Sequence, residues 1–244
     1  MPDFNQRIIA PSLLAADWTK LGQECRRALA AGGDWLHLDV MDGHFVKNIS
    51  YGANFVHHVR RSAPEAFLDT HLMIERPDQY LQDFIDAGVN NISIHLEPAY
   101  DVGDTLKRIR NAGISTGLAI NPSTPLGNAE PFLDQVDLLL IMTVVPGFGG
   151  QEFMETETMP KVADACKIRA ARKLSFHIGV DGGIDSKTFT TNQPSLHALA
   201  HNALKQLTQH IGVSEPAMAV DRKGRMIGNT VLKAQPAKPA VRQI

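Results

Sequence analysis

Short apolar segments alternate with amphipathic ones along most of the chain. Seven of the apolar segments are each the length of one strand, and their starts lie 23 to 37 residues apart. Such spacing is typical of a repeated strand–helix unit and a parallel sheet. The predicted strands are Ile8–Leu13, Trp35–Met41, Phe67–Ile74, Asn91–Glu97, Ser115–Ile120, Leu138–Val144 and Ser175–Asp181.

The segments between these strands have the period of helices that bury one face. Leu21, Cys25 and Leu29 fall on one stripe of a helix that Asp17 can cap and Gly32 can end. Ala-Gly pairs also end the predicted helices before the strands at 91 and 115. The pattern predicts an α/β fold, and 244 residues match a (β/α)₈ TIM barrel of about 250 residues.

The pattern changes after residue 188, and an eighth barrel strand cannot be recognised. Residues 195–210 predict an amphipathic helix, whereas residues 218–232 hold two β-prone stretches around the 222–225 turn, as in a hairpin. Residues 233–244 contain two prolines and predict a loose tail. We therefore expect a barrel in residues 1–188 and a divergent segment, 189–244, that completes or covers it.

Composition narrows the class of protein. Charged residues make up 20% of the chain and the formal net charge is −2, which does not suggest a nucleic-acid or membrane partner. The longest apolar run, 138–145, is far below the ~20 residues of a membrane helix. The first residues lack the features of a signal peptide, so we expect a soluble cytoplasmic protein. Cys25 and Cys166 lack metal-site spacing and are expected to be reduced.

Polar residues interrupt the second and third predicted strands on one face. Side chains alternate in a strand, so His37, Asp39 and Met41 share a face, as do His71 and Met73. The inward face of a barrel strand leads to the mouth, where active sites lie. These residues are candidate metal ligands, although a hydrogen-bonded buried histidine and a capping aspartate are the alternative reading.

Two further stretches carry candidate chemistry. Asp181 ends the last predicted strand before Gly182 and Gly183, which allow a ligand to approach the backbone. Residues 146–151 are glycine-rich, and their backbone N–H groups suit a phosphate, although turn formation alone would explain the glycines. His95 is a candidate for supporting the site from behind, whereas His177, deeper in its strand, is expected to be structural.

One reaction would use all of these groups. Removal of a proton beside a ketone produces a negative enediolate, which a metal ion can stabilise. Inversion of a stereocentre needs one group to remove a proton and another to return it on the opposite face. Asp39 and Asp181 could act in this way, while Met41, Met73 and Met142 exclude water, unless these methionines serve only core packing.

In their order along the chain, the motifs closely resemble those of the ribulose-phosphate 3-epimerase family. The resemblance covers roughly residues 7–188. It rests on the segments Ala10–Asp17, His37–Val46, Thr70–Ile74, His95–Glu97, Pro146–Gln151 and Val180–Gly183.

The resemblance implies metal-dependent epimerisation of D-ribulose 5-phosphate to D-xylulose 5-phosphate in the pentose phosphate pathway. It implies that Asp39 and Asp181 are the acid–base pair, and that one divalent ion (zinc, iron, manganese or cobalt) is the cofactor. The implied metal ligands are His37, Asp39, His71 and Asp181. The implied substrate-binding residues are Ser12, His71, Gly147, Phe148, Gly149, Gly150, Asp181, Gly182 and Gly183. Homo-oligomers are common in the family.

The C-terminal sequence departs from this family. After Asp-Gly-Gly the family continues with a helix, an apolar strand and an Ala-Gly-Ser turn that helps to hold the phosphate, and residues 184–244 contain no such sequence. A frameshifted or truncated gene product and a true replacement both fit. Three functions therefore stay open: the ribulose-phosphate enzyme, an epimerase for a related ketose phosphate such as allulose 6-phosphate, and a catalytically impaired barrel.

Overall fold

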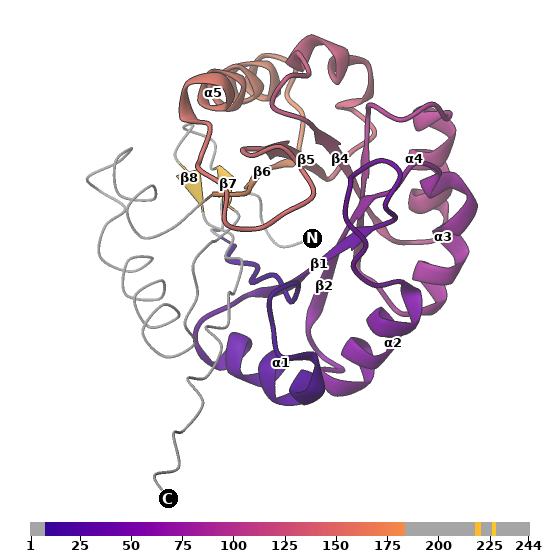
Figure 1. Cartoon of the computed structure of the whole chain (residues 1–244). Helices are drawn as coiled ribbons and strands as arrows, with labels where there is room; N and C mark the ends of the chain where they lie inside the picture. Colours follow the sequence, from indigo (N-terminus) through magenta and orange to yellow (C-terminus); the bar gives the residue numbers. More distant parts are fainter. Residues whose placement is uncertain (1–7, 184–217, 221–225, 228–244) are drawn as a thin grey trace, which may run out of the picture.

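A curled parallel sheet with helices on its outside forms the body of the protein (Figure 1). The computed structural model describes residues 8–183, 218–220 and 226–227. Neighbouring parallel strands follow the chain order, as expected for an α/β barrel. They are β1 (Trp35–Met41), β2 (Phe67–Met73), β3 (Asn91–His95), β4 (Ser115–Ile120), β5 (Leu138–Met142) and β6 (His177–Asp181).

Helices connect most of these strands and cover the outer face of the sheet (Figure 1). The α-helices are α1 (Leu21–Ala30), α2 (Ala53–Ser62), α3 (Pro77–Asp86), α4 (Val102–Asn111) and α5 (Glu155–Ala171). Short 3₁₀ turns η1 (Trp18–Lys20), η2 (Leu126–Asn128) and η3 (Glu130–Phe132) complete the set, and η2 and η3 replace a helix between β4 and β5. Among the described residues, no helix combines the length and hydrophobicity that a membrane crossing requires.

The first predicted strand, Ile8–Leu13, is an extended segment that runs parallel to β1. It contacts β1 through a bridge between Ser12 and His37, and the His37 N–H donates to the carbonyl of Pro11 at 2.8 Å. The other six predicted strands are confirmed, with ends that differ by no more than two residues. The segment therefore brings Ser12 beside the inward face of β1.

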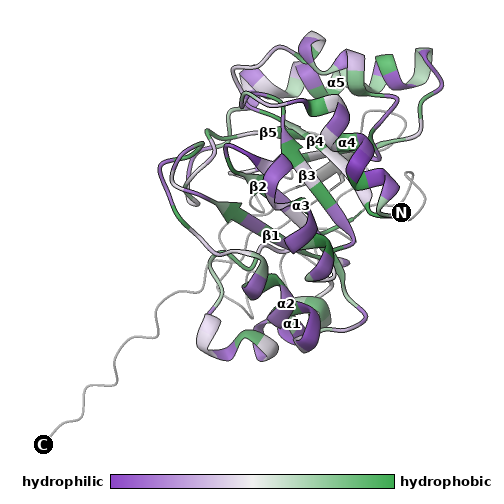
Figure 2. Cartoon of the chain, turned by 90° about the vertical axis from the view of Figure 1, so that its right-hand side faces the viewer, coloured by the Kyte–Doolittle hydropathy of each residue, from purple (hydrophilic) through white to green (hydrophobic). Residues whose placement is uncertain are grey.

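Side chains along β1 alternate between the hydrophobic core under the helices and the interior of the barrel. Leu36, Leu38 and Val40 point outward from β1 and pack in the main hydrophobic core under the helices. In Figure 2 much of β1, β3 and β5 is hydrophobic, whereas the surrounding helices carry both hydrophilic and hydrophobic segments. The intervening residues face the barrel axis, where β1 and β2 pair without offset. From bottom to mouth the facing pairs are Trp35 and Phe67, His37 and Asp69, Asp39 and His71, and Met41 and Met73.

An antiparallel pair continues the sheet beyond β6. Strand β7 (Met218–Val220) pairs antiparallel with β6, and β8 (Met226–Ile227) pairs antiparallel with β7. The two predicted β-prone stretches are thus strands of one sheet, while the predicted turn, the helix at 195–210 and the tail at 233–244 lie outside the described residues. The division at residue 188 stays a prediction. Pairing with β7 gives β6 backbone partners that an exposed edge would lack.

Two neighbouring strands inside the barrel pack too closely at Gly117 to leave space for a side chain. Gly117 in β4 faces Ser93 in β3, and a Cβ on Gly117 would lie 2.0 Å from Ser93 Oγ and 2.9 Å from Ser93 Cα. A Cβ on Gly103, in α4, would make its nearest contact at 3.6 Å. Gly117→Ala should lower the free energy of unfolding by ~1–3 kcal/mol through overpacking. Gly103→Ala should raise it by ~0.4–1 kcal/mol because it restricts the unfolded chain.

Urea denaturation of the two variants measures both effects, with each serving as the control for the other. A Gly117→Ala midpoint equal to that of the unchanged protein would show that the strands separate easily at this position.

Candidate metal and acid–base site

Four buried side chains from three strands meet inside the barrel mouth. They are His37 and Asp39 of β1, His71 of β2 and Asp181 of β6, and one potential ligand atom of each lies within 4.8 Å of all the others. Asp39 Oδ1 lies 3.2 Å from His37 Nε2 and 3.3 Å from His71 Nδ1. Asp181 Oδ2 lies 3.8 Å and 3.5 Å from the same two nitrogens. Nitrogen and oxygen atoms therefore alternate around one centre.

His37 directs its Nε2 at this centre. Its Nδ1 lies 2.8 Å from Asp69 Oδ2, and Asp69 Oδ1 accepts a hydrogen bond from Asn91 at 2.8 Å. Its Nε2 is buried, and Asp39 Oδ1, 3.2 Å away, does not meet it with hydrogen-bond geometry. Buried polar atoms are normally satisfied, and a metal-binding imidazole usually donates its other N–H to a carboxylate. The residues present thus fit a divalent metal.

Electrostatics also favour positive charge at the centre. Burial raises the pKa of Asp39, but His37 and His71 outweigh this and hold the pKa of Asp39 well below its usual range. Burial lowers the pKa of both His37 and His71, yet their carboxylate neighbours raise each above its ordinary value. Three buried carboxylates, Asp39, Asp69 and Asp181, attract protons onto the imidazoles, and a metal cation can replace those protons.

Hydrogen bonds fix the orientation of Asp39. Ser12 Oγ donates to Asp39 Oδ2 at 2.5 Å, and the Asp39 N–H donates to the hydroxyl oxygen of Tyr51 at 3.0 Å. Tyr51 stacks on Phe55, with ring centroids 4.1 Å apart. Ser12, expected to bind substrate, is therefore placed to orient a carboxylate. Sequence reasoning missed Tyr51, because its contact with Asp39 depends on the path of the loop after β1.

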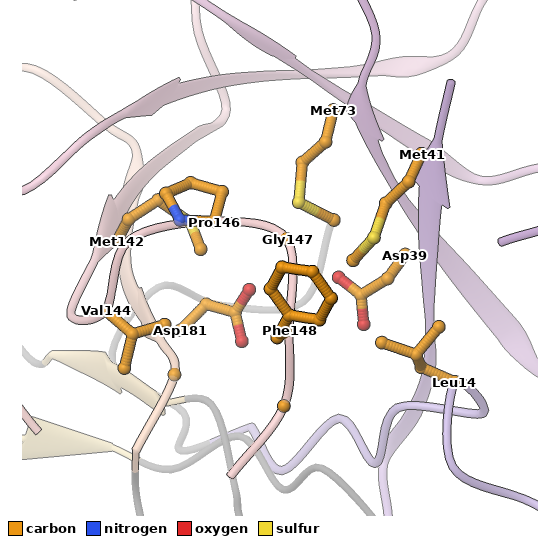
Figure 3. A pocket seen from close by; sticks show the side chains of 12 residues that line it. Leu14, Asp39, Met41, Met73, Met142, Val144, Pro146, Gly147, Phe148 and Asp181 are labelled. Carbon is orange, nitrogen blue, oxygen red and sulfur yellow. The ribbon is translucent and has the colours of Figure 1, made fainter. Parts of the chain in front are cut away.

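A pocket opens above the four residues. Figure 3 shows the carboxylates of Asp39 and Asp181 facing one another from opposite sides of the pocket. Met41, Met73 and Met142 line it as expected, and Phe148 lies at its rim with 59% of its surface exposed. The structure adds Leu14, Val144 and Pro146 to the lining. The two acids are thus at the polar base of an apolar pocket.

Backbone from two glycine-containing turns completes the pocket wall. Gly147, Gly149 and Gly182 line the pocket, whereas Gly150 and Gly183 do not. Gly183 has a φ of 66°, and a Cβ on it would lie 2.6 Å from the backbone nitrogen of Phe153. The lack of a side chain at residue 183 therefore allows two turns to pack closely. Asn48 Nδ2 ties the Gly147 turn to the loop after β1 by donating to the Gly147 carbonyl at 2.7 Å.

The remaining histidines occupy separate places. His95 Nε2 lies 2.9 Å from His71 Nε2, directly behind the four residues, as expected for a supporting group. Burial lowers the pKa of His95 to about 4 and so favours its neutral form. His177 begins β6 and packs edge-on to Trp35 in the bottom layer, at 6.2 Å between ring centroids. It is distant along the strand from Asp181.

Known proteins resemble the chain at both the sequence and the fold level. The sequence model of the ribulose-phosphate 3 epimerase family matches residues 8–198. Ribulose-phosphate 3-epimerase from Synechocystis sp. is 44% identical over 179 residues, which cover 72% of this chain and 77% of that protein. The enzyme of the same name from Aquifex aeolicus is 41% identical over 178 residues, covering 73% and 79% of the two chains.

A solved structure supports the fold alone. Mycobacterium tuberculosis tryptophan synthase superposes with a TM-score of 0.53 at 12% identity, covering 83% of this chain and 93% of that one. More than a quarter of this chain lies outside the match to either epimerase. The matched part contains the whole candidate site, and the chain belongs to the ribulose-phosphate 3-epimerase family, a family of isomerases.

Proposed function

We propose that the protein interconverts D-ribulose 5-phosphate and D-xylulose 5-phosphate by epimerisation at C3. The observation that carries the proposal is the pair of carboxylates, Asp39 and Asp181, that face one another across the pocket, with the buried Nε2 of His37 directed at the same centre. Curated relatives of this name, more than 40% identical to the chain, support the substrate. We also propose that the protein acts in the cytoplasm as a homo-oligomer.

The ligand set suits one divalent ion. His37, Asp39, His71 and Asp181 offer two imidazole nitrogens and two carboxylate oxygens, a combination that binds zinc, iron, manganese or cobalt. When bound, such an ion supplies Lewis-acid stabilisation of negative charge on the substrate oxygens.

Asp39 and Asp181 move the protons. The carboxylate of Asp39 removes the C3 proton, the C–H electron pair forms the C2–C3 double bond, and the carbonyl electron pair moves to the C2 oxygen. Asp181, as a carboxylic acid, then delivers a proton to the opposite face of C3, and the C2 carbonyl forms again. After a forward turnover Asp39 loses its proton to solvent and Asp181 regains one, so atoms and charge balance over a cycle. The two residues exchange roles in the reverse reaction.

The pocket walls protect this chemistry and hold the substrate. Met41, Met73 and Met142 exclude water from the enediolate, which strengthens the electrostatic interactions around it. Backbone N–H groups of Gly147, Gly149 and Gly182 are available to the phosphate. Phe148, Gly150 and Gly183 shape the same turns.

Loss of either carboxylate should stop the reaction. Asp39→Asn and Asp181→Asn should each lower kcat by about 10²–10⁴-fold or more, because each removes one proton carrier. Xylulose 5-phosphate formation and the entry of solvent deuterium at C3 measure this directly. Asp137→Asn is the control, because Asp137 Oδ2 accepts a hydrogen bond from the Thr116 N–H at the opposite end of the barrel. Half-normal turnover in either site variant would contradict the two-aspartate mechanism.

Divalent metal should stabilise the folded protein. After chelation, Co²⁺ at 100 times its Kd should add ~2.7 kcal/mol to the free energy of unfolding, because only the folded chain assembles the four ligands. Thermal melting with and without Co²⁺ measures the gain, and Asp181→Asn should lose most of it. Identical melting curves for the unchanged protein would rule out the metal site.

A further inference from the structure

A line of hydrogen bonds leads from His71 away from the metal centre. His71 Nε2 lies 2.9 Å from His95 Nε2, and His95 Nδ1 lies 2.9 Å from Glu97 Oε2. Both imidazoles are fully buried, and their rings are close to parallel, with 27° between the planes. Phe45 packs on His95 at 4.7 Å between ring centroids.

The chemistry of this line fixes where each hydrogen lies. An ionised Glu97 can only accept, so His95 Nδ1 carries a hydrogen. His71 Nδ1 is the nitrogen that faces Asp39 and Asp181, so it is the free ligand atom when a metal is bound, and the hydrogen of His71 then lies on Nε2. His95 Nε2 lies within hydrogen-bond distance and must accept that hydrogen, which leaves His95 Nδ1 as the donor to Glu97. This assignment follows from hydrogen-bond geometry.

Glu97 is itself held at both carboxylate oxygens. While Oε2 accepts from His95, Oε1 accepts from the Asn121 N–H at 2.7 Å and from Thr124 Oγ1 at 2.5 Å. Lys161 of α5 donates to backbone carbonyls of the same loop, including that of Thr124 at 2.7 Å. The loop after β4 therefore fixes the far end of the line that begins at His71.

We propose that His95 and Glu97 are positioning residues of the metal site, which hold His71 in the tautomer that offers Nδ1 to the ion. The proposal rests on the metal site of the proposed function. Hydrogen-bonded partners behind metal ligands commonly change metal affinity by about 10–100-fold. The effect should be of that size here, because an untethered His71 could rotate or present the wrong nitrogen.

Two substitutions of His95 separate hydrogen bonding from packing. His95→Gln keeps an acceptor for His71 but loses the ring, whereas His95→Phe keeps a ring of similar volume but loses the acceptor. We expect the Kd of the chelated protein for Co²⁺ to stay within about threefold for His95→Gln and to rise at least tenfold for His95→Phe. Absorption of bound Co²⁺ measures the Kd and reports the ligand arrangement. The reverse order would overturn the proposal.

Glu97→Gln tests the far end of the line. His95 Nδ1 and the Asn121 N–H bond different oxygens of Glu97, and the amide replaces one of these oxygens with an NH₂ group, so one of the two donors would lose its acceptor. We expect about tenfold weaker Co²⁺ binding. Glu24→Gln is the matched control, because Glu24 is a buried carboxylate on α1 that pairs with Arg27 away from the site. Equal Co²⁺ affinities of Glu97→Gln and Glu24→Gln would overturn the proposal. This comparison does not depend on His95→Phe, so it remains decisive if that variant fails to fold.

Failure of this inference differs from failure of the proposed function. If the unchanged protein binds no Co²⁺, the metal site itself is wrong. If it binds Co²⁺ and the His95 and Glu97 variants bind equally well, only the positioning role is wrong. Nitrogen NMR of the zinc-loaded protein gives an independent reading, because the hydrogen of His71 should reside on Nε2. A hydrogen on Nδ1 would overturn the proposal.

Discussion

The register in which β1 and β2 pair determines which of their side chains lie next to each other inside the barrel. It places His37 beside Asp69, Asp39 beside His71 and Met41 beside Met73. A slip of one residue would turn these side chains toward the helices and bring leucines and Val40 inward. The site therefore depends on strand register, which the outward leucines stabilise by burial in the main core.

Burial of two carboxylates and three imidazoles in this space is costly unless each is paired. Asp69 and Glu97 each accept from one histidine, while Ser12 donates to Asp39. These partners leave His37 Nε2, His71 Nδ1 and one oxygen from each aspartate directed at the centre. The pairing that makes burial tolerable thus also orients the ligands.

Much of this arrangement could be predicted from sequence, because strands have a period of two. Alternation in β1 and β2 was enough to select His37, Asp39 and His71 as one inward group. It could not select Tyr51, whose hydroxyl reaches the backbone of Asp39 through a loop of unpredictable path. Nor could it give the antiparallel direction of β7, because short β-prone stretches carry no signal for orientation. Ser12 was found, but its contact with Asp39 depends on how Ile8–Leu13 lies against β1.

The position of β7 has a consequence for how this protein can change over evolutionary time. The four ligands and their hydrogen-bonded partners Ser12, Tyr51, Asp69, His95 and Glu97 all precede residue 182. Strand β7 contributes backbone pairing to β6 but none of these side chains. Selection on the reacting groups and selection on strand β7 can therefore act on separate stretches of the gene. A change in β7 that retains backbone pairing with β6 would therefore leave the four ligands and their partners in place.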